Sequence, residues 1–245
     1  MAEAYDTIGH GYGALRREDP RIAAHILRAL AGASSVVNVG AGTGSYEPRG
    51  LALVAVEPSR VMLRQRARDT APAVRGVASH LPFPADAFDA SLAILTIHHW
   101  PDLAAGLGEL RRVARDRVVV LTADPGCEGF WLLDYFPAIA ELDRTWMPRL
   151  DAFDAHLGPC EIAPIAVPHD CIDGFLGAYW RRPHEYLDAE RRKAISAFTE
   201  IGDLRPGLDA LRRDLESGEW RRRYGDLLER DSLDIGYRLV VARCT

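Results

Sequence analysis

The first half of the chain alternates between two hydrophobic patterns. Continuous apolar runs, which indicate strands covered on both faces, occupy residues 35–39, 51–56, 73–77, 88–97 and 117–123. Elsewhere the apolar residues recur three or four positions apart, as on one helix face, and predict helices over residues 19–30, 59–68 and 101–114. The first helix begins with an N-cap, Asp19, followed by Pro20. Strands that alternate with helices predict a doubly wound α/β fold with a mostly parallel sheet.

The pattern changes after Asp124. Half of the aromatic residues of the chain fall within residues 130–186, and this enrichment predicts helices that line an apolar substrate chamber above the strand ends. Residues 162–167 predict a sixth strand, and further helices are expected near residues 188–201 and 207–228. The final run, GYRLVVAR, predicts a last, antiparallel edge strand and completes a sheet of seven strands.

We expect a single domain with four parts. They are an N-terminal flap over residues 1–18, a cofactor-binding core over 19–125, a helical and aromatic cap with the sixth strand over 126–233, and the last strand over 234–245.

Three glycines, at positions 40, 42 and 44, directly follow the first apolar run. Ligands of open α/β sheets bind beyond the carboxyl ends of the strands, and glycine permits both a positive-φ turn and the close approach of a ligand. The second run ends on Glu57, which places a carboxylate at the tip of the neighbouring strand. Only residues 45–50 separate the glycines from that run. A crossover normally takes a dozen or more residues, so its helix is expected to be reduced to a turn or missing.

These features constrain the ligand. A dinucleotide site has the spacing G-x-G-x-x-G and a helix N-terminus for the pyrophosphate, whereas this chain has G-x-G-x-G and a truncated crossover. The pattern favours a ligand without phosphate, in which an amino acid and a nucleoside lie along the turn. Glu57 would then accept hydrogen bonds from two ribose hydroxyls.

Four segments, VVNVGAGTG, VAVEPS, LPFPADAFD and LAILTIHHW, resemble the successive motifs of class I S-adenosylmethionine-dependent methyltransferases. The likeness is to the small-molecule branch called methyltransferase type 11, similar to the ubiquinone and menaquinone biosynthesis type, and covers about residues 5–125. The resemblance implies a Rossmann-like fold and methyl transfer from S-adenosylmethionine, with S-adenosylhomocysteine as the product.

The resemblance also implies cofactor contacts at matching positions. Gly40, Ala41 and Gly42 would cradle the methionine and ribose portions, and Glu57 would bind the ribose hydroxyls. The adenine would be bordered by Pro58, Ser59, Met62, Ala78 and Ser79, and the methionine part would lie over Leu95 and Thr96.

Two positions depart from the family pattern. Asn38 stands where an acid is usual, and we expect it to keep the geometry with a weaker electrostatic hold on a sulfonium ligand. Val77 replaces an acid near the adenine amino group, which would then be satisfied by Ser79, the main chain or water.

Candidate catalytic residues follow the fourth strand. His98 or His99 would act as the general base, being a side chain that titrates near neutral pH; the alternative is a packing or hydrogen-bonding role. Tyr12 and Arg16 are expected to close over the cofactor, or else to lie on a solvated helix face. Candidate substrate contacts are Tyr5, Trp131, Tyr135, Tyr179 and Trp180, although aromatic residues at helical spacing also form ordinary core.

The charge, the cysteine spacing and the lengths of the apolar stretches limit the kinds of partner that we expect. The net charge of −5 and pI near 5.9 argue against non-specific nucleic-acid binding, which requires a basic face. The four cysteines lack C-x-x-C spacing, so neither a metal site nor a disulfide framework is indicated. We find no apolar stretch of the roughly 20 residues that a spanning helix needs and no signal-peptide pattern, and we expect a cytoplasmic protein.

The sequence thus predicts methyl transfer to an oxygen, nitrogen or carbon of a small apolar or aromatic metabolite, in secondary metabolism, by a monomer or homodimer. Two alternatives remain open. One is a catalytically inactive ligand-binding or scaffold protein of the same fold. The other is a methyltransferase that acts on protein or RNA.

Overall fold

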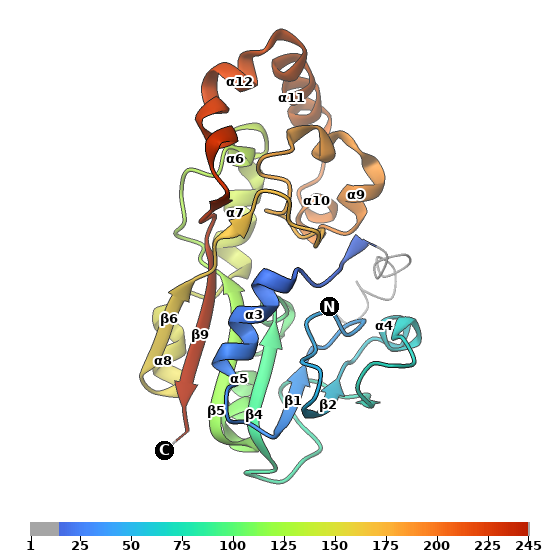
Figure 1. Ribbon diagram of the computed structural model, residues 1–245, viewed down its shortest axis with the longest axis vertical. Helices are drawn as coiled ribbons and strands as arrows, with labels where there is room; N and C mark the ends of the chain where they lie inside the picture. Colours follow the sequence, from blue (N-terminus) through green and yellow to red (C-terminus); the bar gives the residue numbers. More distant parts are fainter. Residues whose placement is uncertain (1–14, 245) are drawn as a thin grey trace.

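The computed structural model describes residues 15–244, and its centre is a seven-stranded sheet in the order β3-β2-β1-β4-β5-β9-β6 (Figure 1). The strands are β1 (Ser35–Val39), β2 (Ala52–Val56), β3 (Ala73–Val74), β4 (Phe88–Ile94), β5 (Ala114–Ala123), β6 (Cys160–Pro164) and β9 (Tyr237–Arg243). Strands β1 to β5 are parallel, and β9 is antiparallel to both of its neighbours. The expected doubly wound, mostly parallel α/β fold is confirmed.

The predicted edge position of the last strand is wrong. Strand β9 lies between β5 and β6, so β6 forms the edge. The burial of the two strands gives the physical reason. Val240 and Ala242 of β9 are fully buried, as suits an inner strand. Strand β6 is exposed at most positions and ends in a proline, which is tolerated at a sheet edge.

Alternate residues of each strand pack on opposite faces of the sheet. On one face Val36 packs in a core that includes Ile26 of α3 (Pro20–Ala29). On the other face Val37 shares a core with Leu110 of α5 (Leu103–Val113) and Phe153 of α8 (Asp151–Leu157). Helix α3 begins as predicted, because the Asp19 side chain accepts a hydrogen bond from the Arg21 N–H.

Between β1 and β2 the described chain forms turns and no helix, as the short crossover predicted. Helix α4 (Arg60–Gln65) ends earlier than expected. Arg66 takes an extended conformation at its C-cap, with its side chain directed to Glu47. Strand β3 is two residues long rather than five, and Val77 instead forms an isolated bridge with His80.

The remaining helices gather beyond one end of the sheet (Figure 1). They are α6 (Leu132–Tyr135), α7 (Pro137–Trp146), α9 (Ala189–Lys193), α10 (Ser196–Glu200), α11 (Arg205–Ser217) and α12 (Glu219–Tyr224), with the short 3-10 helices η2 (Pro183–Leu187) and η3 (Gly225–Glu229). A two-stranded sheet, β7 (Val167–Pro168) with β8 (Ser232–Leu233), joins them. We call this region the cap.

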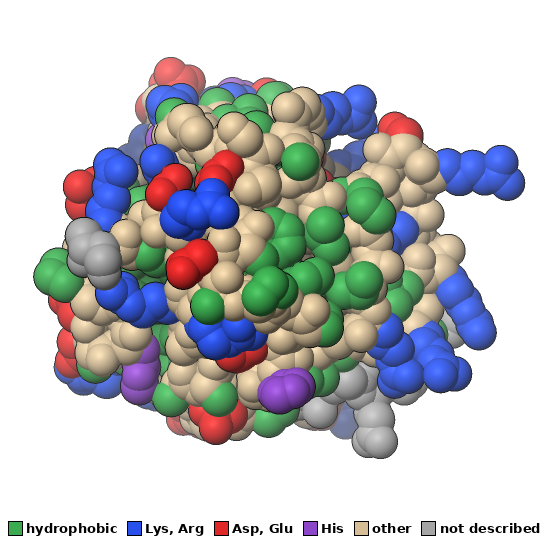
Figure 2. All heavy atoms as spheres, turned by 90° about the horizontal axis from the view of Figure 1, so that it is seen from below, with side chains coloured by type: hydrophobic (Ala, Val, Ile, Leu, Met, Phe, Trp, Pro, Cys, Tyr) green, Lys and Arg blue, Asp and Glu red, His purple; other side chains and the backbone are tan. Residues whose placement is uncertain are grey.

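The surface and the cysteines indicate no further binding site among the described residues. At the end of the molecule away from the cap, side chains of both charge signs are interspersed with hydrophobic ones (Figure 2). Within residues 15–244, no helix is long and apolar enough to cross a membrane. The four cysteines are unpaired, and among the described residues no cluster of three potential metal ligands occurs.

Candidate functional site

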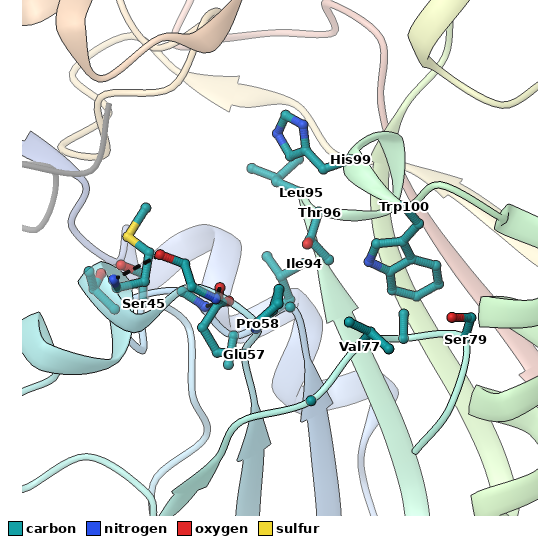
Figure 3. Close-up of a pocket in the computed structure, with 18 of the residues that line it drawn as sticks. Ser45, Glu57, Pro58, Val77, Ser79, Ile94, Leu95, Thr96, His99 and Trp100 are labelled. Atoms are coloured by element: carbon teal, nitrogen blue, oxygen red, sulfur yellow. Dashed lines mark hydrogen bonds between the residues drawn. The ribbon is translucent and has the colours of Figure 1, made fainter. Parts of the chain in front are cut away.

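A cavity of about 230 Å³ lies where β1, β2 and β4 end. Figure 3 shows its side chains around the end of β4, with Ser45 and Glu57 on one side and Val77, Ser79 and Trp100 on the other. We call it the first cavity. The candidate site residues that line it are Arg16, Gly40, Ala41, Gly42, Glu57, Pro58, Ser59, Met62, Ala78, Ser79, Leu95, Thr96 and His99. Tyr5 and Tyr12 lie outside the described residues.

The glycine turn brings the ends of β1 and β4 into contact. Gly40 has a φ of 73°, and a Cβ on it would lie 2.1 Å from Thr96 Oγ1. Any side chain at position 40 is therefore disfavoured for two reasons, the positive φ and the lack of space beside Thr96. A Cβ on Gly42 would meet no atom within 4 Å, so the turn faces open space there.

Main-chain donors hold the Glu57 carboxylate at the edge of the first cavity. Its Oε2 accepts from the Gly42 N–H at 2.8 Å and its Oε1 accepts from the Ser59 N–H at 2.8 Å. The residue is only 6% exposed. Glu57 is thus oriented by the chain, with its carboxylate at the end of β2 and in the lining of the first cavity.

A buried ion pair supports the turn where a crossover helix would normally lie. The Arg66 guanidinium donates to both oxygens of Glu47, at 2.7 and 2.8 Å, and each side chain is 6% exposed. Arg66 also donates to the Gly42 carbonyl, and Glu47 accepts from the Ala71 N–H. Sequence reasoning missed this pair. The one feature of the sequence that indicates this ion pair is an acidic residue inside a short loop that has to fold over apolar neighbours.

Asn38 belongs to this support and not to the lining of the first cavity. It is 2% exposed, and its Nδ2 donates to Glu47 Oε1 at 3.4 Å. An Asp at position 38 would place a second carboxylate against Glu47, where like charges repel. The nearby Glu47 gives a physical reason for an amide at this position.

Arg16 connects the strand ends to the cap. Its Nε donates to Asp173 Oδ1 at 2.6 Å and its Nη2 donates to Oδ2 at 3.3 Å. The Asp173 side chain is fully buried. The main-chain carbonyl of Arg16 accepts from Ser45 Oγ. Arg16 lines the first cavity as expected, but the structure pairs its guanidinium with the cap.

A second cavity, of about 110 Å³, adjoins the first, because Arg16 and Leu95 line both. Most of the residues that line it are apolar, and they come from the segment after β4, from the end of β5, from β9 and from the cap. Leu95 has a φ of 49°, a conformation that a branched side chain rarely adopts. The aromatic and ionisable residues that line this second cavity are Arg16, His98, Asp124, Cys127, Phe130, Asp143, Trp146, Phe175 and Tyr237.

The two candidate catalytic histidines occupy different cavities. Both lie in η1 (Ile97–His99), and His99 lines the first cavity while His98 lines the second. The His98 ring stacks on Trp146 with centroids 6.1 Å apart. Burial lowers the pKa of His99 to about 4. Burial, with the neighbouring His99 and Arg16, lowers the pKa of His98 well below its usual value. Both rings are therefore neutral at pH 7.

The four aromatic residues expected to form the substrate chamber lie in the core of the cap instead. Trp131 Nε1 donates to the Trp180 carbonyl at 2.7 Å, and Trp180 Nε1 donates to the Val167 carbonyl. Tyr135 donates to Asp214, and the Tyr179 hydroxyl accepts from Arg191. All four are nearly fully buried and line neither cavity.

Other aromatic residues surround the second cavity. They are Phe130, Trp146, Phe175 and Tyr237. Aromatic enrichment signalled a chamber in this part of the chain, but it did not identify which rings face it. Phe130 lines the cavity and its sequence neighbour Trp131 does not, because successive side chains point in different directions.

Comparisons with known proteins agree with this geometry. The family described as "Methyltransferase domain" matches residues 37–122. The crystal structure of a putative methyltransferase from an antibiotic biosynthesis pathway of Anabaena variabilis is 36% identical, with a TM-score of 0.86, over 93% of this chain and 98% of that one.

Two more distant relatives extend the comparison. The chain is 33% identical over 115 residues to 2-methyl-6-phytyl-1,4-hydroquinone methyltransferase 2, chloroplastic, of Oryza sativa subsp. japonica. That match covers 41% of this chain and about a third (32%) of the length of the rice protein. A possible histamine N-methyltransferase of Thermotoga maritima has a TM-score of 0.62 over the whole of both chains at 13% identity, which supports the fold alone.

Proposed function

Because the chain belongs to the class I S-adenosylmethionine-dependent methyltransferases, we propose that it methylates an oxygen, nitrogen or carbon atom of a small, largely apolar or aromatic metabolite. The observation that carries this proposal is the pair of adjoining cavities. One is built from the glycine turn and Glu57, and the other has mainly apolar walls. Leu95 and Arg16, which line both, mark the boundary where the methyl group would pass.

The residues of the first cavity fit S-adenosylmethionine. The Glu57 carboxylate lies at the end of β2, where it would accept hydrogen bonds from the two ribose hydroxyls. The turn at Gly40 and Gly42 would hold the methionine and ribose parts, and Pro58 and Met62 would border the adenine. The proposed remaining contacts are Arg16, Ala41, Ser59, Ala78, Ser79, Leu95 and Thr96. Val77 also lines this cavity, so the adenine amino group would bond to Ser79, the main chain or water.

Catalysis would rest mainly on alignment. The bound cofactor supplies a methyl group already activated by its positively charged sulfur. The chain has to hold the acceptor atom in line with that methyl group and to exclude water. His98 lines the second cavity as a neutral ring, so it would take the proton from an acceptor hydroxyl or amine as the new bond forms.

Isothermal titration calorimetry with S-adenosylmethionine tests the cofactor site. Replacing Glu57 with Ala removes the acceptor for two hydroxyl groups, and hydrogen bonds to charged groups contribute about 1.5–3 kcal/mol each. The loss of two such bonds corresponds to at least about 3 kcal/mol, so we expect the affinity to fall at least about 100-fold. Asp116→Asn, at an exposed acid on β5 outside the first cavity, is the control and should bind like the wild type. Absence of binding by the wild type would refute the cofactor assignment.

Turnover separates an enzyme from an inactive binding protein. S-adenosylhomocysteine release is measured with a panel of phenols, aromatic amines and small carbon acids. We expect release with at least one member of the panel. His98→Ala should bind S-adenosylmethionine normally and turn over at least about 100-fold more slowly, the usual contribution of a general base. Tight cofactor binding without turnover on any acceptor would favour the scaffold alternative.

A further inference from the structure

Two acids, Asp124 and Asp143, line the second cavity, and Asp143 is the one that lies on a helix of the cap. Asp143 lies on α7, and Ala140, Asp143 and Trp146, each three positions apart, all line the cavity. Residues at this spacing share one helix face, so α7 turns a carboxylate inward together with an aromatic ring. Within residues 15–244, the Asp143 side chain forms no hydrogen bond or ion pair, and it is partly buried.

None of the other ionisable groups that line the second cavity supplies a positive charge that pairs with the Asp143 carboxylate. Of the other ionisable groups that line the cavity, Arg16 is ion-paired with Asp173, and His98 is neutral. Asp124 accepts from the Gly126 N–H and lies 3.8 Å from Arg238. The remaining two, Cys127 and Tyr237, are neutral because burial raises their pKa values. Burial alone likewise raises the pKa of Asp143 to about 6.

A carboxyl group in such surroundings favours a ligand that can donate to it. Removing a polar group from water costs free energy unless a hydrogen bond replaces the lost hydration. A ligand with an apolar ring and one donor group would fill the cavity and supply that hydrogen bond. The rings of Phe130, Trp146 and Phe175 provide surfaces on which an aromatic ring packs.

We propose that Asp143 recognises the methyl acceptor, by accepting a hydrogen bond from a hydroxyl or amino group on an otherwise apolar or aromatic molecule in the second cavity. This inference rests on the proposed function, because the second cavity is taken as the acceptor site. It narrows the acceptor from any small apolar metabolite to one that carries a hydrogen-bond donor within reach of α7.

Three probes of similar shape test the proposal on protein saturated with S-adenosylhomocysteine, by ligand-observed NMR titration. Benzyl alcohol carries a neutral donor, benzylamine a charged donor, and ethylbenzene none. The wild type should prefer one or both donor probes to ethylbenzene, and the tighter of the two identifies the donor class. Asp143→Leu should weaken each donor probe that the wild type prefers at least 10-fold and change ethylbenzene by no more than twofold.

A second variant separates charge from hydrogen bonding. Asp143→Asn keeps an acceptor oxygen, so benzylamine should weaken at least 10-fold and benzyl alcohol only about threefold. In the wild type, benzylamine affinity should fall as the pH drops through about 6, and in Asp143→Asn this dependence should vanish. The matched controls Glu141→Leu and Glu141→Gln, on the exposed side of α7, should bind all probes as the wild type does.

Three outcomes would overturn the proposal. They are unchanged donor affinity in Asp143→Leu, equal loss of all three probes, or a wild type that does not prefer a donor probe. If S-adenosylhomocysteine binds and the donor probes are not distinguished, this inference fails and the proposed function stands. If the wild type does not bind S-adenosylhomocysteine, both fail.

Discussion

The two cavities are built in different ways. The first takes most of its residues from short segments that follow β1, β2, β3 and β4. Main-chain groups fix it, since the N–H groups of Gly42 and Ser59 hold Glu57. The second takes its residues from the ends of β4 and β5, from β9 and from several parts of the cap, and side chains define it. A site made by the main chain requires particular residues at particular spacings, whereas one made by side chains tolerates many combinations.

The largest effect expected concerns the support of the first cavity. Glu47→Ala leaves the Arg66 guanidinium buried without its partner, and breaking a buried pair in this way typically costs about 3–5 kcal/mol. Urea unfolding should show a loss of that size, with weaker S-adenosylmethionine binding in calorimetry. Asp151→Ala removes an exposed partner of Arg149 and should change stability by less than about 1 kcal/mol. Equal effects of the two variants would mean that the ion pair does not support the turn.

Next in size is the loss of affinity expected for Gly40→Ala. The new Cβ would overlap Thr96 at a positive φ, so the turn or the end of β4 has to move. We expect S-adenosylmethionine affinity to fall about 100-fold, equivalent to about 2.7 kcal/mol. Gly50→Ala is the matched control, since its φ is also positive but its surroundings are open. It should lose about 1 kcal/mol of stability and keep its affinity. An affinity retained by Gly40→Ala would show that the first cavity is less rigid than its contacts indicate.

This difference in construction explains what the sequence allowed us to predict. The alternation of parallel strands with helices, the missing crossover helix and the positions of Gly40 and Glu57 follow from local patterns, and the structure places these two residues together. The exchange of β6 and β9 at the edge was not predictable, because an apolar run indicates burial but not the neighbouring strand. The Glu47–Arg66 pair joins residues that no local pattern relates.

The residues that line the second cavity could not be predicted from local sequence patterns, for a further reason. Whether Asp143 or Phe130 faces a cavity depends on how the helices of the cap rotate and pack, and a single sequence does not fix those angles. One signal was present. Asp143 lies four residues after the buried Ile139 and three before Trp146, so it falls on the inward face of an amphipathic helix, where a charged residue is unusual.

A smaller effect is expected in the pH dependence of stability. In the unfolded chain the histidine pKa is 6.5, and in the folded protein burial lowers that of His99 to about 4. As the pH falls from 6.5 to 4, the unfolded chain therefore gains a proton that the folded protein excludes, and stability decreases by about 2–3 kcal/mol. His99→Phe should reduce this slope in urea unfolding between pH 4 and 6.5. His156→Phe, at an exposed site on α8, should not, and a slope unchanged in His99→Phe would contradict the burial of the ring.

The smallest effect tests whether the aromatic core of the cap is separate from the acceptor site. Trp131→Phe removes the hydrogen bond from Nε1 to the Trp180 carbonyl and leaves a small void, which should lower stability by about 1–2 kcal/mol. Because Trp131 lines neither cavity, affinities for S-adenosylmethionine and for the aromatic probes should stay within twofold of wild type. Trp146→Phe is the paired variant, since Trp146 lines the second cavity, and it should weaken the probes severalfold. If Trp131→Phe weakened probe binding as much as Trp146→Phe, the chamber would extend into the cap core, as the aromatic enrichment of the sequence first predicted.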